Sequence, residues 1–351
     1  METSKLLDLL QAYQNAPKEF QATSYWSSYS KDILDTISTM DISEMQSGKY
    51  PILATIGFGD FIYYYHPNLP LWKKIVLKFI HGYLIKDRPI LPYDLRISDI
   101  TEMAYHHCEL MANLTGAKQI GAIEIATVGN PVDVFTINGK KYSVNFLGYY
   151  LRYCFAHKHI SIKGNEIIVE LGSGSGKQIE VLKKLYPDLT VLCFDLPAQI
   201  FLCETYLSGA LGKDNIVGTD VTLKWKDLSN LKKGRVYCFG NWQFPLIKDF
   251  EFDVFWNAAS FGEMEPEVVE NYLFYIKEKA KCIYLLQSRN GKETKGKVHV
   301  KKKTTFNDYN RLLSGYLLQE QHDAYEAHRR ISQFGGYFEG VWKKDGYEKK
   351  F

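Results

Sequence analysis

The sequence lacks the features that mark several large classes of protein. No stretch of about 18 uninterrupted apolar residues occurs, and the N-terminus METSKLLDLLQAY has no apolar signal-peptide core, so neither a transmembrane segment nor export is expected. The net charge is only +3, and no nucleic-acid partner is expected. The six cysteines show no C-x-x-C spacing, which indicates reduced core residues of a cytoplasmic protein and no metal site.

The most informative stretch is NEIIVELGSGSGK, residues 165–177. Ile167, Ile168 and Val169 predict a short buried strand, which leads through Glu170 into a turn with glycines at 172, 174 and 176. Because glycine has no Cβ, such a turn lets the backbone approach a ligand closely. A strand, a tight turn and a helix over 177–186 are therefore predicted, with a ligand site at the turn.

Three kinds of glycine turn differ in their spacing. A phosphate-binding loop needs glycine at 171 and Ser or Thr at 178, where the chain has Leu171 and Gln178. A dinucleotide fingerprint needs its third glycine at 177, which is Lys177. The remaining pattern, acidic-x-G-x-G-x-G, resembles motif I of class I S-adenosylmethionine-dependent methyltransferases. A purely structural turn is the alternative.

The resemblance implies S-adenosyl-L-methionine as cofactor and a set of binding residues. Glu170 is expected to serve the cationic amino-acid end of the cofactor, and Asp195 to accept hydrogen bonds from the ribose diol. Asp220 is expected near the adenine, and Asn257 orients cofactor or acceptor. The complete expected set is Glu170, Gly172, Ser173, Gly174, Gly176, Asp195, Leu196, Asp220 and Asn257.

Strands and helices alternate after residue 160. Further strands are expected at 190–194, 216–217, 252–259 and 282–286, with helices at 197–212 and 266–280 and a closing hairpin from 317–321 and 336–343. This order predicts an α/β fold, a Rossmann-like methyltransferase sheet over 161–351. Residues 1–160 are expected to form a mainly helical cap with a small hairpin at 133–145, turning at Asn138-Gly139.

Several segments of the cap have open interpretations. Residues 1–47 look helical in pieces, interrupted at Ser24–Ser30, and residues 51–67 resemble a loop or lid with Asp60 and Tyr63–Tyr65 as candidate contacts. The basic amphipathic helix 71–85 fits a packed surface helix, a homodimer contact or a membrane-surface helix. The lysine-rich run 292–303 predicts a solvated loop.

A narrower likeness rests on ELGSGSGKQ, FDLPAQIFLCETYLSGALG, FWNAASFGEMEPEVVENYL and the preceding NGKKYSVNFLGYYLRYCFAHKHI. Together they resemble a bacterial sugar O-methyltransferase family associated with surface-polysaccharide gene clusters, over residues 130–290. That resemblance implies methylation of a hydroxyl on a sugar, nucleotide sugar or other small acceptor. The alternatives are a small-molecule O-, N- or C-methyltransferase of natural-product metabolism and a non-catalytic scaffold.

A sugar hydroxyl is a weak acid, so a general base would assist its methylation. Glu263 follows the fourth expected strand and is the first candidate, although it could instead stabilise the N-terminus of the helix that begins at Pro266. Ser260 would orient the acceptor, and His107 could contribute from the cap. The remaining candidates are bases at His157, His299, His322 and His328 and pocket residues Tyr149, Tyr150 and Tyr153.

Overall fold

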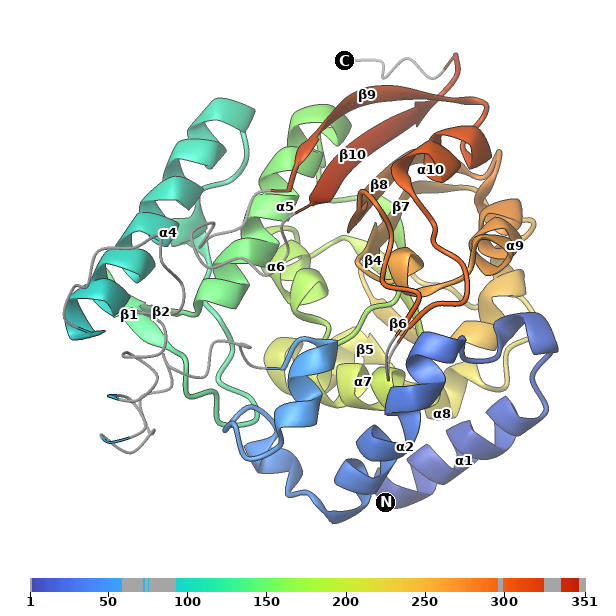
Figure 1. The fold of residues 1–351 in the computed structure, drawn as a ribbon, viewed down its shortest axis with the longest axis horizontal. Coiled ribbons are helices and arrows are strands. Elements are labelled where there is room, and N and C mark those ends of the chain that lie inside the picture. The colour runs from blue at the N-terminus through green and yellow to red at the C-terminus, as the bar shows by residue number, and fades with distance from the viewer. Residues whose placement is uncertain are drawn as a thin grey trace.

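In a computed structural model of the chain, the structure describes residues 2–58, 72, 75, 93–295, 299–324 and 336–346. Its centre is an eight-stranded sheet with strand order β5-β6-β4-β3-β7-β8-β10-β9 (Figure 1). The strands β5, β6, β4, β3, β7 and β8 are parallel to one another, and β10 is antiparallel to both of its neighbours. The strands are β3 (Ile167–Leu171), β4 (Thr190–Asp195), β5 (Ile216–Val217), β6 (Val236–Gly240), β7 (Phe252–Ala258), β8 (Ala280–Ser288), β9 (Tyr316–Asp323) and β10 (Tyr337–Lys344).

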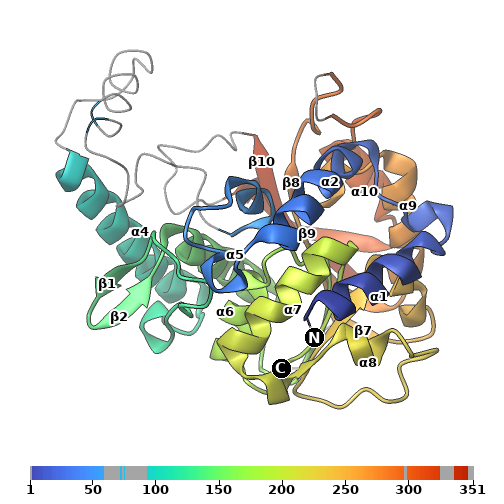
Figure 2. The same cartoon turned by 90° about the horizontal axis from the view of Figure 1, so that it is seen from below.

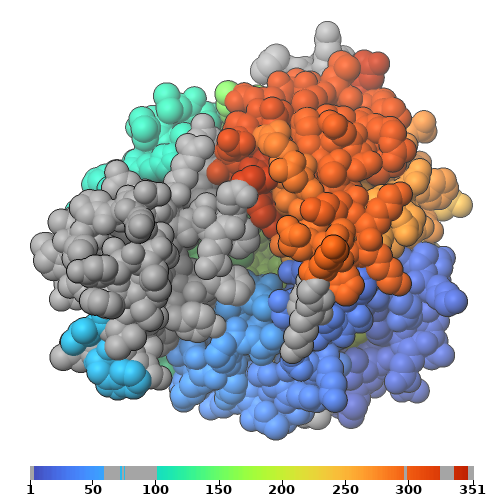
Figure 3. All heavy atoms as spheres, viewed as in Figure 1, coloured from blue at the N-terminus to red at the C-terminus, as the bar shows by residue number. Residues whose placement is uncertain are grey.

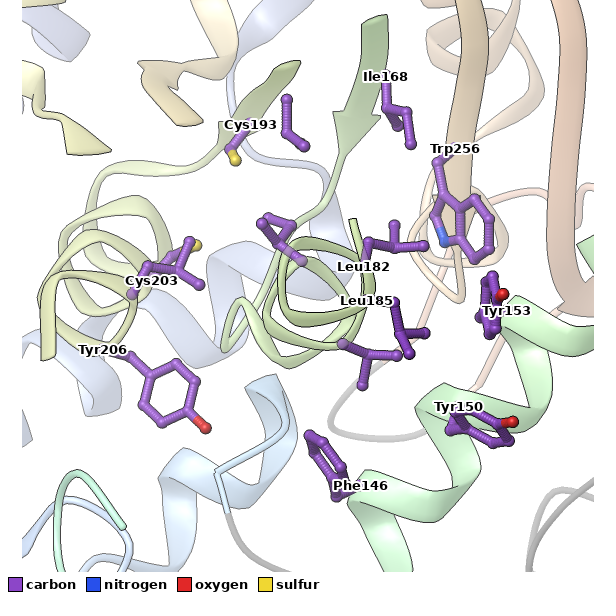
Figure 4. Packing of buried hydrophobic residues seen from close by; sticks show 14 of the residues in the cluster. Phe146, Tyr150, Tyr153, Ile168, Leu182, Leu185, Cys193, Cys203, Tyr206 and Trp256 are labelled. Carbon is purple, nitrogen blue, oxygen red and sulfur yellow. The ribbon is translucent and has the colours of Figure 1, made fainter. Parts of the chain in front are cut away.

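Neighbouring residues of each central strand are buried on opposite faces of the sheet. Ile168 and Trp256 join an apolar cluster with α5 and α6, which Figure 4 shows, whereas Val169 and Phe255 join a second cluster on the other face. This alternation follows from the two-residue period of a strand. The helices are α5 (Val144–Ile160), α6 (Lys177–Leu185), α7 (Pro197–Leu211), α8 (Thr219–Thr222), α9 (Pro266–Ile276) and α10 (Phe306–Leu312).

The fold class is the one that the sequence predicts. The central strands are parallel, helices cover both faces, and the order reverses at β3, as in a doubly wound Rossmann-like sheet. The closing hairpin is present as β9 and β10. The small hairpin is also confirmed, since β1 (Phe135–Ile137) pairs with β2 (Lys140–Tyr142) across Asn138 and Gly139, both at positive φ. All six cysteines are free and buried.

The N-terminal segment packs on the sheet domain. Helices α1 (Glu2–Gln14) and α2 (Ser24–Thr39) contact α7, and α1 also contacts α8 (Figure 2). Lys5 of α1 forms ion pairs with Glu204 of α7 and Asp220 of α8. Leu9 and Ile33 belong to the same buried cluster as α5 and α6, so the N-terminal helices and one face of the sheet share a core.

One strand, β6, is not among those that the sequence predicts. The strand β6, sequence VYCFG, lies between β4 and the short edge strand β5. The residue beside Asp195 at the carboxyl edge is therefore Gly240 of β6. Asp220, expected at this edge, lies one strand further out on α8 and pairs with Lys5.

The predicted interruption at Ser24–Ser30 is also wrong, because α2 begins at Ser24 and runs through it. The hydroxyls of Ser27 and Ser28 donate to the Ser24 carbonyl, and that of Ser30 donates to the Trp26 carbonyl at 2.8 Å. Serine side chains often disfavour a helix because they hydrogen-bond to nearby backbone groups. Here they donate to carbonyls three or four residues earlier in the same helix, which is compatible with helical geometry.

Several predictions fall outside the described residues: most of the helix 71–85, the lid candidates Asp60 and Tyr63–Tyr65, and His328. A further helix, α4, spans Tyr93–Thr115. No helix among the described residues is long and apolar enough to cross a membrane.

Candidate active site

The glycine turn after β3 requires its glycines. Gly172, Gly174 and Gly176 all have positive φ, at 78°, 51° and 78°. A Cβ on Gly172 would lie 2.5 Å from the Ser260 hydroxyl oxygen, and one on Gly174 would lie 2.9 Å from the Ile56 carbonyl oxygen. Both the backbone conformation and the space therefore exclude larger residues. The loop after β7 and an N-terminal segment both touch the turn.

Polar atoms around the turn are buried without hydrogen-bond partners. They include the Glu170 Oε2 atom and the hydroxyls of Ser173 and Ser175, three residues that are 4%, 7% and 2% exposed. An unsatisfied buried polar group costs about 1–3 kcal/mol, so several around one turn indicate a site built for a polar ligand.

Two carboxyl groups border the turn, Asp195 and Glu170. Asp195, at the carboxyl end of β4, accepts hydrogen bonds from the backbone N–H groups of Gly174 and Leu196, each at 2.8 Å. Burial raises the pKa of Asp195 to about 7 against the effect of these two bonds, and the charge of Glu263 raises it further. Burial and then the charge of Asp195 raise the pKa of Glu170, which Arg152 of α5 opposes. A cationic ligand with hydroxyl donors would satisfy both groups.

Asn257 and Ser260 hold the carboxyl end of β7 against β3. The Asn257 amide donates to the Leu171 carbonyl at 2.8 Å and to the Ser260 hydroxyl at 2.6 Å, and its oxygen accepts from the Gln287 amide at 2.5 Å. Ala259 between them has φ 67°, a strained conformation for alanine. The Asn257 side chain is fully engaged in these bonds, so it shapes the turn through Ser260.

Glu263 lies in the short helix η8 (Phe261–Glu263) that follows. Its carboxylate accepts a hydrogen bond from the indole N–H of Trp26 at 3.0 Å and pairs with the Lys292 ammonium at 3.3 Å. Burial raises the pKa of Glu263, while Lys292 and the neighbouring side chains of Trp26 and Tyr25 oppose that rise. The structure therefore brings Glu263 and Ser260 together near the turn, with a cation and an indole from distant parts of the chain.

The other candidates are placed elsewhere. His107 lies on α4, which packs on α5 at the opposite edge of the molecule from α9 (Figures 1 and 2). Its neighbour His106 is within 2.8 Å of the Glu109 carboxylate on an exposed face. Tyr150 and Tyr153 are fully buried in the core, where the Tyr150 hydroxyl donates to a backbone carbonyl.

Two further candidates come from α5 and β9. Tyr149 reaches the N-terminal segment over the turn, since a Cβ on Gly57 would lie 2.7 Å from its hydroxyl. His322 lies at the outer edge of the sheet, with Nε2 3.5 Å from the Glu339 carboxylate.

Trp26 and Lys292 were not among the predicted site residues. Each is far from Glu263 in sequence, and Lys292 belongs to the run expected to be a solvated loop. The backbone of that run is anchored at His299 and Lys301, because the carbonyl of His299 accepts from the Ser24 hydroxyl and the N–H of Lys301 donates to the Glu265 carboxylate at 3.1 Å. Figure 3 shows the N-terminal surface in blue bordering the orange surface that contains this loop.

No protein-family model and no curated protein matches the sequence. Similar solved structures include a mitomycin 7-O-methyltransferase, 13% identical over 56% of each chain with a TM-score of 0.38. A SAM-dependent methyltransferase from Aquifex aeolicus is 14% identical over 54% of this chain and 87% of that one, with a TM-score of 0.35. An O-methyltransferase from neocarzinostatin biosynthesis, in complex with S-adenosyl-L-homocysteine and 1,4-dihydroxy-2-naphthoic acid, is 15% identical over 56% of each chain, with a TM-score of 0.35.

The matches to the mitomycin and neocarzinostatin enzymes thus span about half of their length. At such low identity and TM-score, any functional conclusion has to come from the residues of the site.

Proposed function

We propose that the chain is an S-adenosyl-L-methionine-dependent methyltransferase that methylates a hydroxyl group of a small-molecule acceptor. The observation that carries the proposal is the group of buried, unsatisfied polar atoms around the glycine turn, together with the two carboxyl groups whose pKa values are raised. A ligand with positive charge and a ribose diol would satisfy these atoms. The resemblance of the turn to motif I of class I methyltransferases supports the same conclusion.

Different residues at the turn would bind different parts of the cofactor. Glu170 would bind the amino group at its unpartnered Oε2 atom, and Ser173 would hydrogen-bond nearby. Asp195 would accept from the ribose hydroxyls, because its two backbone hydrogen bonds leave further lone pairs. Leu196 fixes that carboxylate through its N–H. Asp220 remains a predicted contact near the adenine.

When bound, the cofactor supplies a methyl group on a positively charged sulfur. The chain's own task is then to align the acceptor hydroxyl with the S–C bond and to take up its proton. Glu263 would accept the proton as the hydroxyl oxygen forms the new C–O bond and the S–C bond breaks. Ser260, fixed by Asn257 beside Gly172, would orient the acceptor.

The class of acceptor is the finer part of the proposal. Likeness over residues 130–290 to the sugar O-methyltransferase family favours a sugar or glycan hydroxyl in surface-polysaccharide biosynthesis in the cytoplasm. A natural-product acceptor is the second candidate. It is favoured by the aromatic side chains of Tyr25, Trp26 and Tyr29 beside Glu263, whose ring centroids lie 5.6–5.8 Å apart.

Calorimetric titration with S-adenosylmethionine and S-adenosylhomocysteine tests the cofactor assignment. Wild-type protein should bind both at micromolar concentration, and Asp195→Ala should weaken both strongly. Asp220→Ala, on the outer side of the sheet, is a matched carboxylate variant that measures how far the adenine contact extends. A wild-type protein that binds neither compound would refute the proposed function.

A further inference from the structure

The ion pair beside the proposed acceptor site has a long contact distance for partly buried groups. The Lys292 ammonium is 3.3 Å from the nearer Glu263 oxygen, whereas a short charge-assisted N–H···O contact spans about 2.7–2.9 Å. The two side chains are 23% and 12% exposed. Lysine has three donors, and the contacts with the Glu263 carboxylate and the Tyr337 side chain leave capacity for one further oxygen ligand.

Aromatic rings flank this ammonium on two sides. The centroids of the Tyr25 and Tyr337 rings each lie 5.5 Å from the Lys292 Nζ atom. Tyr25 comes from α2 and Tyr337 from β10, so the cation is enclosed by elements far apart in the sequence. Rings keep the lysine stem in place and exclude water from its sides, which strengthens any charge interaction made there.

Further lysines lie on the same loop. Lys301 and Lys302 are exposed on the loop that is anchored to Ser24 and Glu265, and Lys303 follows them beside Gly291. Their positive potential would attract an anion towards Lys292. The charge of Glu263 raises the pKa of Asp195 at the glycine turn, and Lys292 pairs with Glu263. Glu263 therefore interacts with both Lys292 and the carboxyl group that borders the proposed cofactor site.

We propose that Lys292 determines acceptor specificity by binding an oxyanion of the acceptor, a carboxylate or a phosphate, in exchange for its ion pair with Glu263. This inference rests on the proposed methyltransferase function and adds the chemical class of the acceptor. Glu263 keeps its hydrogen bond from Trp26 after the exchange, but it loses its cation. A carboxylate without a neighbouring cation binds a proton more strongly, so an anionic acceptor would activate its own general base.

Matched probes test the exchange on the full chain saturated with S-adenosylhomocysteine. The first pair is 1-hydroxy-2-naphthoic acid and 1-naphthol, and the second is glucose 1-phosphate and methyl glucoside. Binding is measured by calorimetry. In at least one pair the anionic member should bind about tenfold more tightly, the value of one charge-assisted contact.

Variants of two lysines on the same loop identify the residue responsible. Lys292→Met should abolish the preference for the anion, whereas Lys292→Arg should retain it. Lys295→Met removes an exposed charge three residues away and should change the preference less than twofold. The pair in which the anionic member binds more tightly than the neutral one shows whether the acceptor carries a carboxylate or a phosphate.

Two outcomes would overturn the inference: equal binding of both members of each pair, or an anion preference that survives in Lys292→Met. The cofactor product serves as the internal check, because its affinity should be the same in all four proteins. Failure of wild type to bind it would reject the proposed function, whereas normal binding without anion preference would reject only the role of Lys292.

Discussion

Cofactor affinity should depend on pH through Asp195. The pKa of this carboxyl is raised to about 7 in the free protein, and ligand hydroxyls favour its ionised form. Below pH 7 the carboxyl must lose a proton before it binds, so affinity should increase with pH and level off above 7. A group with a pKa of about 7 is roughly one-tenth ionised at pH 6, which makes binding about tenfold weaker there than at pH 8.

Calorimetry in buffers of different ionisation enthalpy measures this linkage directly. Wild-type protein should release about 0.9 proton per cofactor at pH 6 and about 0.1 at pH 8 if Asp195 is the linked group. Asp195→Asn keeps the size of the side chain but cannot titrate, so its binding should be weaker and release about one proton fewer at pH 6. The reasoning is refuted if wild type and Asp195→Asn release the same number of protons.

The same carboxyl links stability to pH in the absence of ligand. Its folded pKa lies above the unfolded value, so between about pH 4 and 7 the folded chain holds a proton that the unfolded chain has lost. Stability should therefore fall as pH rises through this window. Asp195→Asn should remove that part of the slope in urea titrations, and a steeper slope in the variant would contradict the assignment.

Three substitutions test other parts of the site. Glu263→Gln should reduce turnover by about 10²–10⁴-fold with cofactor affinity nearly unchanged, and equal loss of both would reject Glu263 as the base. Gly174→Ala should abolish cofactor binding because its Cβ meets the Ile56 carbonyl, whereas Gly139→Ala, which has a similar φ and open space, should leave binding intact. Lys183→Met should lower the free energy of unfolding by about 2 kcal/mol or more, measured by urea titration, because the buried ammonium donates to three backbone carbonyls; an unchanged midpoint would contradict this role.

Much of the sheet could be predicted because its signals are local. The apolar run before Glu170, the glycine spacing and the helix over 177–186 each depend on residues close together in the chain. They are confirmed by β3, the turn and α6. Strand β6 was missed because five apolar residues carry too little pattern to separate a buried strand from a loop. Its place beside β4 is decided by tertiary packing.

The surroundings of Glu263 could not be predicted for a different reason. Trp26 and Glu263 are separated by 237 residues, and Lys292 reaches them only because its loop is anchored to Glu265 and α2. No periodicity or motif in the sequence predicts that these three side chains come into contact. Glu263 could be selected from its place after a strand, but its partners required the folded chain. The serine-rich start of α2 likewise hid a helix that contributes three aromatic side chains to the site, Tyr25, Trp26 and Tyr29.

The backbone carbonyl of Ile56 against Gly174 has a consequence for how such a protein evolves. The N-terminal segment reaches the cofactor turn at Ile56 and the opposite edge of the same site at Trp26. A new acceptor preference gained by altering α2 would therefore also disturb contacts on which the cofactor turn depends. Exchange of whole N-terminal regions between homologues should seldom yield active hybrids unless η8 is exchanged with them. Specificity in this architecture would change through small, paired substitutions across that contact.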